Sequence, residues 1–321
     1  MKHSDPATKK FKKIVLYDLE PVPTSEEFKL ELKNMCKTFK VCWAKSDYTA
    51  ALKKSDIAGA DCLIVNVLEK YNGELLGGNG LKYLGLMYTA LGDVDLTYLR
   101  MNKVAVTNAS WYSREPVAEQ TMGMLLNIAK NIGESIEFTR SGSYGFGSFK
   151  KTGWELKGKT LGVVGYGKIG SRVAELAEAF GMNVIYYSRH RKNVPYKFTP
   201  IDELLKKCDI VSVCMSSSED NKHFFDRKRI SMLKRNAVLL SISPGDLVDA
   251  GALYARCKKG DLFVGFDRLD DKMWREKLLK LDNFYLTPWN STNSRDALHA
   301  LEDEALDNAK SFLVGKQAGR V

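Results

Sequence analysis

A short run in the middle of the chain constrains its fold more than any other feature. Residues Thr160–Gly170 read TLGVVGYGKIG, an apolar, β-branched segment that ends in three glycines at the spacing G-x-G-x-x-G. The apolar part predicts a buried parallel strand. Gly165 permits the tight turn that follows, Gly167 lets a pyrophosphate approach the backbone, and Gly170 lets the next helix pack close to the strand.

The residues after the glycines, SRVAELAEAFG, have helical spacing. Unpaired N–H groups at the start of such a helix attract phosphate groups. Glycines at this spacing are a weak signal when they stand alone, and a purely structural glycine turn is the alternative interpretation. Their position between a strand and a helix favours a dinucleotide-binding unit.

Length and composition limit the classes of protein to which this chain can belong. The chain has 321 residues, enough for two domains with cores of their own. No apolar run approaches the ~20 residues that a transmembrane helix needs, and the first residues, MKHSDPATKKFKK, lack the apolar core of a signal peptide. We therefore expect no membrane association. The six cysteines are scattered without a C-x-x-C pair, which argues against a disulfide framework or a metal site and favours a cytoplasmic location.

The formal net charge is +10. The basic residues are spread along the chain without an aromatic-interleaved basic motif, so a lysine-rich surface is the preferred interpretation and no nucleic-acid partner is expected. Nucleic-acid binding stays the alternative. A positive balance also suits anionic ligands such as phosphorylated cofactors.

Strands and helices alternate along the chain, which predicts an α/β fold with parallel sheets covered by helices. Besides the glycine-loop unit, the expected strands are Phe11–Leu19, Phe39–Ala44, Cys62–Val67, Lys82–Tyr88, Val104–Thr107, Asn183–Tyr187, Ile210–Cys214, Ala237–Ser241, Leu262–Phe266 and Phe284–Thr287. The expected helices are Ser25–Thr38, Thr49–Lys54, Glu115–Glu137, Ile201–Lys207, Arg227–Met232, Ala250–Lys258 and Ser294–Leu313.

The order of these elements predicts the domain organisation. An α/β block precedes the glycine loop, and a final helix follows the last strand. We expect a doubly wound dinucleotide-binding domain, residues 105–293, inserted into a smaller α/β domain, residues 1–104 plus 294–321. The two crossings would form a hinge beside a substrate cleft.

The succession of motifs resembles the D-isomer-specific 2-hydroxyacid dehydrogenases over almost the whole chain. The matching segments are VTNASWYSREPVAEQTMGMLLNIAKNI, GWELKGKTLGVVGYGKIGSRVAELAEAFGMNVIYY, CDIVSVCMSSSEDNKHFF, ISMLKRNAVLLSISPGDLVDAGAL, GDLFVGFDRLD and NFYLTPWNS. The resemblance implies a Rossmann-type cofactor domain, a flavodoxin-like substrate domain and an NAD(P)-dependent oxidoreductase. It also implies a homodimer formed through the cofactor domain, for which the apolar stretch 122–134 of the long helix is the candidate surface. Packing within its own domain is the alternative for that stretch.

The family uses an Arg to hold the substrate carboxylate, a His as general acid and base, and a Glu that orients the His. A hydride transfer to a carbonyl needs such a proton donor. In this chain Pro244 stands at the position of the Arg, Trp289 at that of the His and Lys272 at that of the Glu. A shifted register would bring Asp270 or Asp271 to the Glu position.

The sequence offers no replacement histidine. The four histidines are His3, His190, His223 and His299, and none follows the Thr-Pro of the family motif. His299 has the best chance of reaching the cleft, although a place on the helix surface is the favoured interpretation. The resemblance therefore implies a degenerate active site, in which Tyr112, Lys272 or water is the candidate proton donor.

The cofactor positions of the family are largely retained. Lys168 and Ile169 match the positions that meet the pyrophosphate, and Asp267 matches the carboxylate beside the nicotinamide carboxamide. The full set of expected cofactor contacts is Gly165, Tyr166, Gly167, Lys168, Ile169, Ser188, Arg189, Arg191, Met215, Ile242, Ser243, Pro244, Asp267, Trp289, Asn290 and Ser291.

The residues after the second strand of this unit favour NADP(H) over NAD(H). An acidic residue that binds the ribose 2′-hydroxyl is expected about 20 residues beyond the glycine loop. Ser188 stands there, followed by Arg189 and Arg191. A hydroxyl and two guanidinium groups could bind a 2′-phosphate through charge-assisted hydrogen bonds. A solvated basic turn is the alternative.

The expected substrate pocket is lined by Tyr88, Leu91, Gly92, Trp111 and Tyr112. The aromatic side chains of Tyr88, Trp111 and Tyr112, together with Trp289, suggest an aromatic or apolar small-molecule substrate, and core packing of the aromatic residues is the alternative. Two hypotheses about function stay open. One is an oxidoreductase with altered chemistry, and the other is a catalytically silent NADP(H)-binding sensor or scaffold. Residual reduction of 2-oxo acids is a third possibility.

Overall fold

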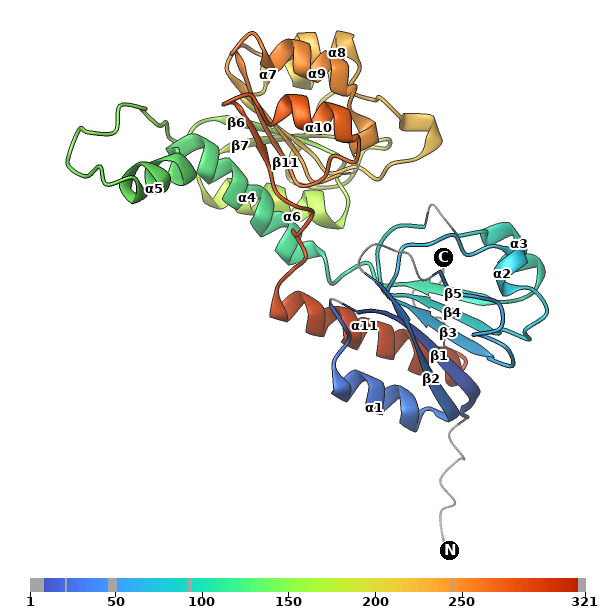
Figure 1. The fold of residues 1–321 in the computed structure, drawn as a ribbon. Coiled ribbons are helices and arrows are strands. Elements are labelled where there is room, and N and C mark those ends of the chain that lie inside the picture. Colours follow the sequence, from blue (N-terminus) through green and yellow to red (C-terminus); the bar gives the residue numbers. More distant parts are fainter. Residues whose placement is uncertain (1–8, 21, 46–50, 92–93, 244, 317–321) are drawn as a thin grey trace, which may run out of the picture. The chain divides into compact units, whose positions relative to one another are not determined.

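The computed structural model describes residues 9–20, 22–45, 51–91, 94–243 and 245–316. The chain divides into two compact units, Met1–Ser113 with Ser294–Val321, and Arg114–Asn293. Each unit has one parallel β-sheet with helices on both faces (Figure 1). The expected α/β fold class is therefore confirmed.

The first unit has a five-stranded sheet in the order β2-β1-β3-β4-β5. Its strands are β1 (Phe11–Leu19), β2 (Cys36–Ala44), β3 (Cys62–Val65), β4 (Tyr83–Leu86) and β5 (Ala105–Asn108). Its helices are α1 (Glu26–Asn34), α2 (Gly73–Leu76), α3 (Leu96–Met101) and α11 (Arg295–Leu313).

Alternate residues of these strands point to opposite faces of the sheet. Leu63 and Val65 of β3 belong to a cluster with α2 and α3. Cys62 and Ile64 belong to a second cluster, which includes buried residues of α1 and α11. The helix that closes the chain thus completes the core of the unit in which the chain begins.

The second unit has a seven-stranded sheet in the order β12-β11-β10-β9-β6-β7-β8. The order reverses between β6 and β9, and such a reversal is where doubly wound folds bind nucleotides. The strands are β6 (Thr160–Val164), β7 (Asn183–Tyr187), β8 (Lys197–Phe198), β9 (Ile210–Val213), β10 (Ala237–Ser241), β11 (Leu262–Phe266) and β12 (Phe284–Leu286).

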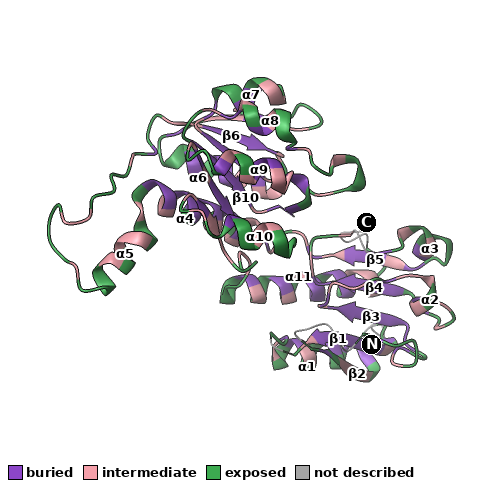
Figure 2. Cartoon of the chain, turned by 45° about the horizontal axis from the view of Figure 1, so that its top comes forward, coloured by how far each residue is buried: buried purple, intermediate pink, exposed green. Residues whose placement is uncertain are grey.

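Two layers of helices cover this sheet. Helices α4 (Arg114–Lys130) and α6 (Lys168–Ala179) pack on one face with Val163 of β6. Helices α7 (Ile201–Lys207), α8 (Arg227–Met232) and α9 (Ala250–Cys257) pack on the other face with Val164. Helix α10 (Lys272–Leu278) joins this second layer through Leu278. Figure 2 shows the buried residues on the strands and on the sheet-facing sides of these helices.

Three expected elements differ from the structure. The long helix Glu115–Glu137 is two helices, α4 and α5 (Ile132–Arg140), because Asn131 between them has a left-handed φ of 53°. The helix expected over Ser25–Thr38 ends at Asn34, because the chain pairs with β1 from Cys36 onward. In the helix expected over Thr49–Lys54, residues 51–54 are not helical and the first two lie outside the described residues.

The first domain boundary also differs from the expected one. The division of the chain falls after Ser113 rather than after residue 104, because β5 pairs with β4 of the first unit. The second crossing between the units falls after Asn293. Among the described residues, no helix is long and apolar enough to cross a membrane.

Candidate functional site

The candidate site of the second unit lies where the strands of its sheet end. Gly165 follows β6 and has a φ of 100°, which L side chains rarely adopt. A Cβ atom at Gly165 would lie 2.7 Å from the backbone of Cys214 and Met215, which follow β9. The turn therefore needs glycine for its conformation and for its contact with the neighbouring strand.

The other two glycines differ in what surrounds them. A Cβ atom at Gly170 would lie 2.1 Å from the carbonyl oxygen of Gly165, so only glycine lets α6 begin this close to the turn. A Cβ atom at Gly167 would meet no atom within 4 Å. Gly167 is also the N-cap of α6 and makes no side-chain capping bond. This open cradle at a helix N-terminus fits a pyrophosphate.

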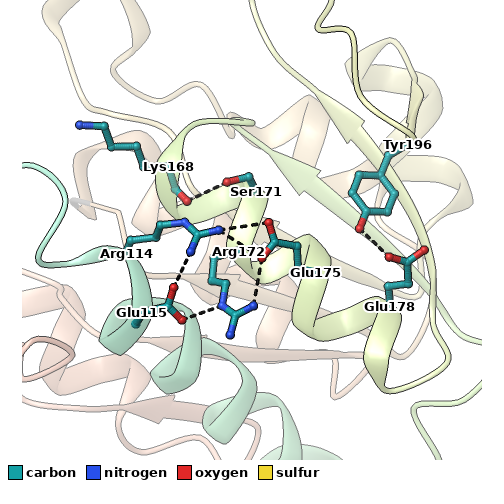
Figure 3. Close-up of polar contacts among 8 residues, drawn as sticks. All are labelled: Arg114, Glu115, Lys168, Ser171, Arg172, Glu175, Glu178 and Tyr196. Atoms are coloured by element: carbon teal, nitrogen blue, oxygen red, sulfur yellow. Dashed lines mark hydrogen bonds and ion pairs between the residues drawn. The ribbon is translucent and has the colours of Figure 1, made fainter.

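A closed ring of ion pairs joins α4 to α6 (Figure 3). Arg114 pairs with Glu115 at 2.5 Å and with Glu175 at 3.1 Å. Arg172 pairs with the same two carboxylates, at 2.6 Å and 3.0 Å. Arg172 stands one helical turn after Lys168, so the ring ties the helix of the glycine loop to the start of α4.

Tyr166 of the glycine loop packs in an aromatic cluster beside β7. Its ring centre lies 4.7 Å from that of Tyr186 and 6.0 Å from that of Tyr196. Burial raises the pKa of Tyr166 above its usual value, so the phenol is neutral at physiological pH. The Tyr196 hydroxyl donates to Glu178 of α6 at 2.9 Å. The cluster therefore braces the glycine loop against the strand that precedes Ser188.

The expected 2′-phosphate residues follow β7 directly. The Ser188 hydroxyl donates to the carbonyl of His190 at 2.5 Å. Arg189 is exposed, and the Arg191 guanidinium lies 5.0 Å from the ring centre of Phe198. No carboxylate stands between Ser188 and Lys197 in the sequence. This turn is positively charged, and the side chains of Arg189 and Arg191 are open to solvent.

The expected contacts after β9 and β10 lie at the same edge of the sheet. Met215 is half-buried against the core, and Ile242 is half-buried. Ser243 is buried, and its hydroxyl donates to the carbonyl of Val213 at 3.1 Å. Pro244, which is expected from the sequence at the position of the family Arg, lies outside the described residues.

Asp267 organises the loop that follows β12. It is fully buried at the end of β11. One carboxylate oxygen accepts from the Thr287 hydroxyl at 2.6 Å and from the Asn290 N–H at 3.1 Å. The other accepts from the Ser291 N–H at 3.2 Å. These bonds assign Asp267 to the support of residues 287–291, a role that the sequence did not suggest.

Trp289 stands at the tip of this supported loop. Its backbone has a left-handed φ of 54°, and its N–H donates to the carbonyl of Asp267 at 2.8 Å. About half of the side chain is exposed, with a relative accessibility of 49%. The guanidinium of Arg268 lies 4.0 Å from the centre of the indole ring. Sequence reasoning missed Arg268, although its position directly after Asp267 was a usable signal.

The remaining candidate donors of the second unit lie on its surface. Lys272 opens α10 with a side chain that is 80% exposed, and its ammonium is 3.9 Å from Glu276. His190 and His223 are exposed. In the first unit, His299 is exposed on α11, as the sequence predicts, and His3 lies outside the described residues.

The residues of the expected substrate pocket do not form one cluster in the first unit. Tyr88 and Leu91 pack on the sheet face that carries α2 and α3. Tyr112 packs on the opposite face with α11. Trp111 is exposed, and Gly92 lies outside the described residues. Core packing, the alternative for the aromatic residues, thus describes Tyr88 and Tyr112 within this unit.

Sequence reasoning also missed Glu304 of α11. Its carboxylate accepts from three successive backbone N–H groups, those of Ser110 at 2.9 Å, Trp111 at 3.0 Å and Tyr112 at 3.1 Å. Charge-assisted bonds of this kind are stronger than neutral ones. The loop that carries Trp111 and Tyr112 is therefore fixed to the C-terminal helix.

Comparisons with known proteins agree with this architecture. Residues 122–291 match the model of the D-isomer specific 2-hydroxyacid dehydrogenase NAD binding domain. Glyoxylate reductase from Thermococcus litoralis is 30% identical over 269 residues, 80% of this chain and 81% of that protein.

Two solved structures are also similar. An acyclic imino acid reductase in complex with NADPH and D-Arg has a TM-score of 0.86 at 28% identity, over 96% of this chain and 99% of that chain. D-lactate dehydrogenase from Aquifex aeolicus, in complex with NAD and lactic acid, has a TM-score of 0.79 at 26% identity, over 94% of this chain and 96% of that chain. This chain therefore belongs to the D-isomer specific 2-hydroxyacid dehydrogenase family of nicotinamide-dependent oxidoreductases.

Proposed function

We propose that this protein transfers hydride between NADP(H) and an aromatic or apolar carbonyl or CH–OH compound, with chemistry altered from that of ordinary 2-hydroxyacid dehydrogenases. One contrast carries the proposal: the glycine cradle of Gly165, Gly167 and Gly170 suits a dinucleotide, whereas Lys272 and Trp289 stand at the family's Glu and His positions. The cofactor function is kept and the usual proton donor is replaced.

Each part of the site has its own role in the proposed hydride transfer. The N-terminus of α6 and Gly167 would hold the pyrophosphate, and the nicotinamide would supply or accept the hydride. Asp267 holds residues 287–291 in place beside that end of the sheet. The proton comes from Tyr112, Lys272 or water. The exposure of Lys272 on α10 favours the other two donors.

The preference for NADP(H) rests on the turn after β7. Arg189 and Arg191 offer guanidinium groups, and the turn has no carboxylate to repel a 2′-phosphate. The similar imino acid reductase was solved with NADPH, and the similar D-lactate dehydrogenase with NAD. We expect Ser188→Asp to lower the affinity for NADPH relative to NADH by roughly tenfold or more, because a hydrogen bond to a charged group contributes about 1.5–3 kcal/mol. Titration of cofactor fluorescence with both nucleotides measures this ratio.

The reaction itself is tested by oxidation of NADPH. We expect slow or no turnover of glyoxylate and hydroxypyruvate, and faster turnover of a member of a panel of aromatic carbonyl compounds and imines. An imine that is already protonated needs no general acid when hydride arrives. Tight binding of NADPH without turnover of any panel member would favour a silent sensor or scaffold. Turnover of glyoxylate at ordinary enzyme rates would contradict the altered chemistry.

We also propose a homodimer, through a surface that differs from the expected one. Met122, Met124, Leu125, Ile128 and Ala129 of the expected surface are buried in the core of their own unit. Helix α5 instead has no buried residue and extends with the following loop away from the sheet of its unit (Figures 1 and 2). Its Ile132 and Ile136 are exposed, and Phe146 of the loop is fully exposed.

Helix α5 and the loop that follows it form an arm. A groove of about 420 Å³ lies at the base of this arm. It is lined by Asn127, Asn131, Gly133, Glu134, Glu137 and Tyr285. In an isologous dimer the arm of one copy would meet the same surface of its partner, and its apolar side chains would be covered. We expect Ile136→Lys combined with Phe146→Lys to lower the mass measured by sedimentation from dimer to monomer. A wild-type monomer at micromolar concentration would contradict the dimer.

We place the protein in the cytoplasm, in keeping with its six free cysteines, all within the described residues. We propose a small molecule, and neither nucleic acid nor membrane, as its partner besides a second copy.

A further inference from the structure

We propose that Arg268 holds an anionic group of the substrate, and that the substrate is an aromatic carbonyl compound that carries a carboxylate. This inference rests on the proposed function, because it assumes that a substrate binds where the family's Arg and His positions lie. It goes beyond that function in assigning a residue that the family's motif does not use for this purpose.

The orientation of the Arg268 guanidinium is fixed on two sides. Its Cζ atom lies over the indole of Trp289, 4.0 Å from the ring centre. Its Nε is 2.9 Å from the carboxylate of Asp270. Among the described residues, the structure gives its two terminal nitrogens no hydrogen bond or ion pair. A planar group with one edge held and the other edge available is suited to bind a carboxylate through two parallel bonds.

A second arginine of the same segment shows what a purely structural role involves. A terminal nitrogen of Arg275 donates to the carbonyls of Leu269 and Asp270, at 2.7 Å and 3.3 Å. That bonding closes the turn before α10. Within the described part of the chain Arg268 makes no such backbone bond, and its side chain is 29% exposed, so its charge is partly desolvated and still accessible.

The location of Arg268 agrees with the proposed role. It follows β11 directly, beside Asp267 and the loop that Asp267 supports, at the carboxyl edge where ligands of such sheets bind. The Gly245 backbone, next to the family's Arg position, lies close to it: a Cβ atom at Gly245 would be 3.3 Å from the carbonyl oxygen of Arg268. A cation at residue 268 could therefore replace one lost at residue 244.

The neighbouring Trp289 defines the rest of the substrate. About half of its side chain stays exposed although Arg268 covers part of the ring. An exposed indole next to a guanidinium offers an apolar surface and a charge side by side. An aromatic ring bearing a carboxylate satisfies both.

Calorimetric titration of the protein saturated with NADP⁺ tests the proposal, because the oxidised cofactor prevents reduction of the probe. The probe is benzoylformate, and its methyl ester is the uncharged control. We expect the wild-type complex to bind the acid at least tenfold more tightly than the ester. Arg268→Gln should abolish this preference, and Arg268→Lys should restore part of it.

Two further variants separate the specific role from general effects. Arg235→Gln removes the same charge from the exposed residue before β10, at the opposite edge of the sheet, and should leave the preference unchanged. Trp289→Leu should lower the preference for the acid over the ester at least threefold, because the guanidinium loses its support. An unchanged preference in that variant would overturn the orienting role of the stack.

The titrations distinguish an error in the role of Arg268 from an error in the proposed function. If wild-type protein binds no NADP⁺, the proposed function is wrong. If it binds NADP⁺ but does not prefer the acid, or if Arg268→Gln keeps the preference with NADP⁺ affinity intact, Arg268 is not the anion-binding residue. A merely structural role would change the affinities for acid and ester together.

Discussion

The glycine loop and the loops after β10 to β12 belong to the same unit but depend on different parts of the chain. At the glycine loop the backbone makes the site: Gly165 needs its positive φ, and Gly170 needs its missing Cβ. In the loops after β10 to β12 side chains decide what the site can do, and we propose that Lys272 and Trp289 stand there in place of the family's reacting groups. On this proposal, resemblance to the family transfers nucleotide binding more safely than it transfers the reaction.

The most direct test of this difference between the two regions is to introduce the family's three residues. We expect the triple variant Pro244→Arg, Lys272→Glu, Trp289→His to reduce glyoxylate at least about 100-fold faster than the wild type, because a general acid contributes about 10²–10⁴-fold. The left-handed backbone at residue 289 tolerates His better than most residues. NADPH oxidation measures the rates.

The matching control is the single variant Trp289→His, which restores the acid without the carboxylate clamp and should gain less. If the triple variant shows no gain while it binds NADPH normally, the loops differ from the family in shape as well as in side chains. Backbone conformation would then decide the function of these loops as well as that of the glycine loop.

Glycine substitutions test the other half of the comparison. We expect Gly170→Ala to lower the free energy of unfolding by about 1–3 kcal/mol and to weaken NADPH binding, because the added Cβ would overlap the Gly165 carbonyl. Gly167→Ala should weaken NADPH binding with little change in stability, since its Cβ would meet no protein atom. Denaturant titration and fluorescence titration measure the two effects.

The control is Gly123→Ala on the exposed side of α4, where a Cβ also meets nothing within 4 Å. It should stabilise the helix by about 0.5–1 kcal/mol and leave NADPH binding unchanged. Equal NADPH affinity in Gly167→Ala and the wild type would show that the cradle is not the phosphate site.

A smaller effect is expected at Asp267, which supports the second of the two regions through its bonds to residues 287–291. Asp267→Asn keeps one acceptor but turns an amide group toward the Ser291 N–H. An unsatisfied buried polar group costs about 1–3 kcal/mol, so we expect a loss of stability in that range without cofactor. If stability is unchanged and only NADPH affinity falls, Asp267 acts on the nicotinamide, as the sequence suggested, and the loop does not depend on it.

The smallest effect is a pH dependence at Asp209, which directly precedes β9 and bonds to Thr160 at the start of β6 and to Lys234 after α8. Burial by itself would raise its pKa, but bonds from the Thr160 N–H and the Lys234 ammonium, each 2.9 Å long, hold the pKa below its usual value. A lowered folded-state pKa means that the carboxylate stabilises the protein above its unfolded pKa and loses this effect as pH falls below about 4.

We therefore expect Asp209→Asn to be less stable than the wild type at pH 7 by about 1 kcal/mol or less, because solvent screens a partly exposed pair. The difference should shrink between pH 4 and pH 2 in urea titrations. A difference that is constant over this range would mean that the charge of Asp209 plays no part.

Much of the fold was predictable because its signals are local. Strands such as Ala237–Ser241 and Leu262–Phe266 are continuous apolar runs, and the structure has them at the expected bounds. The break at Asn131 was not predictable, because both sides of it keep helical spacing and only one residue, Asn131, leaves the helical conformation. The end of α1 was missed because pairing with β1, a non-local interaction, starts at Cys36.

The candidate site was predictable where the backbone makes it. The glycine positions carry their own conformational requirement, so the spacing alone indicates them. The support of residues 287–291 by Asp267 was not predictable, because a buried carboxylate and a cofactor-binding carboxylate look alike in a sequence. The contact of Arg268 with Trp289 joins the loops that follow β11 and β12, and the tyrosines at 88 and 112 separate onto two sheet faces, which periodicity cannot reveal.

The ring of Arg114, Glu115, Arg172 and Glu175 has an electrostatic consequence for the phosphate site. Its two cations and two anions cancel, so these arginines add little to the long-range field, although the chain carries a net charge of +10. We therefore expect oriented backbone N–H groups at the start of α6 to supply most of the attraction for a pyrophosphate, at short range. Such attraction loses less to added salt than attraction by exposed side-chain charges does.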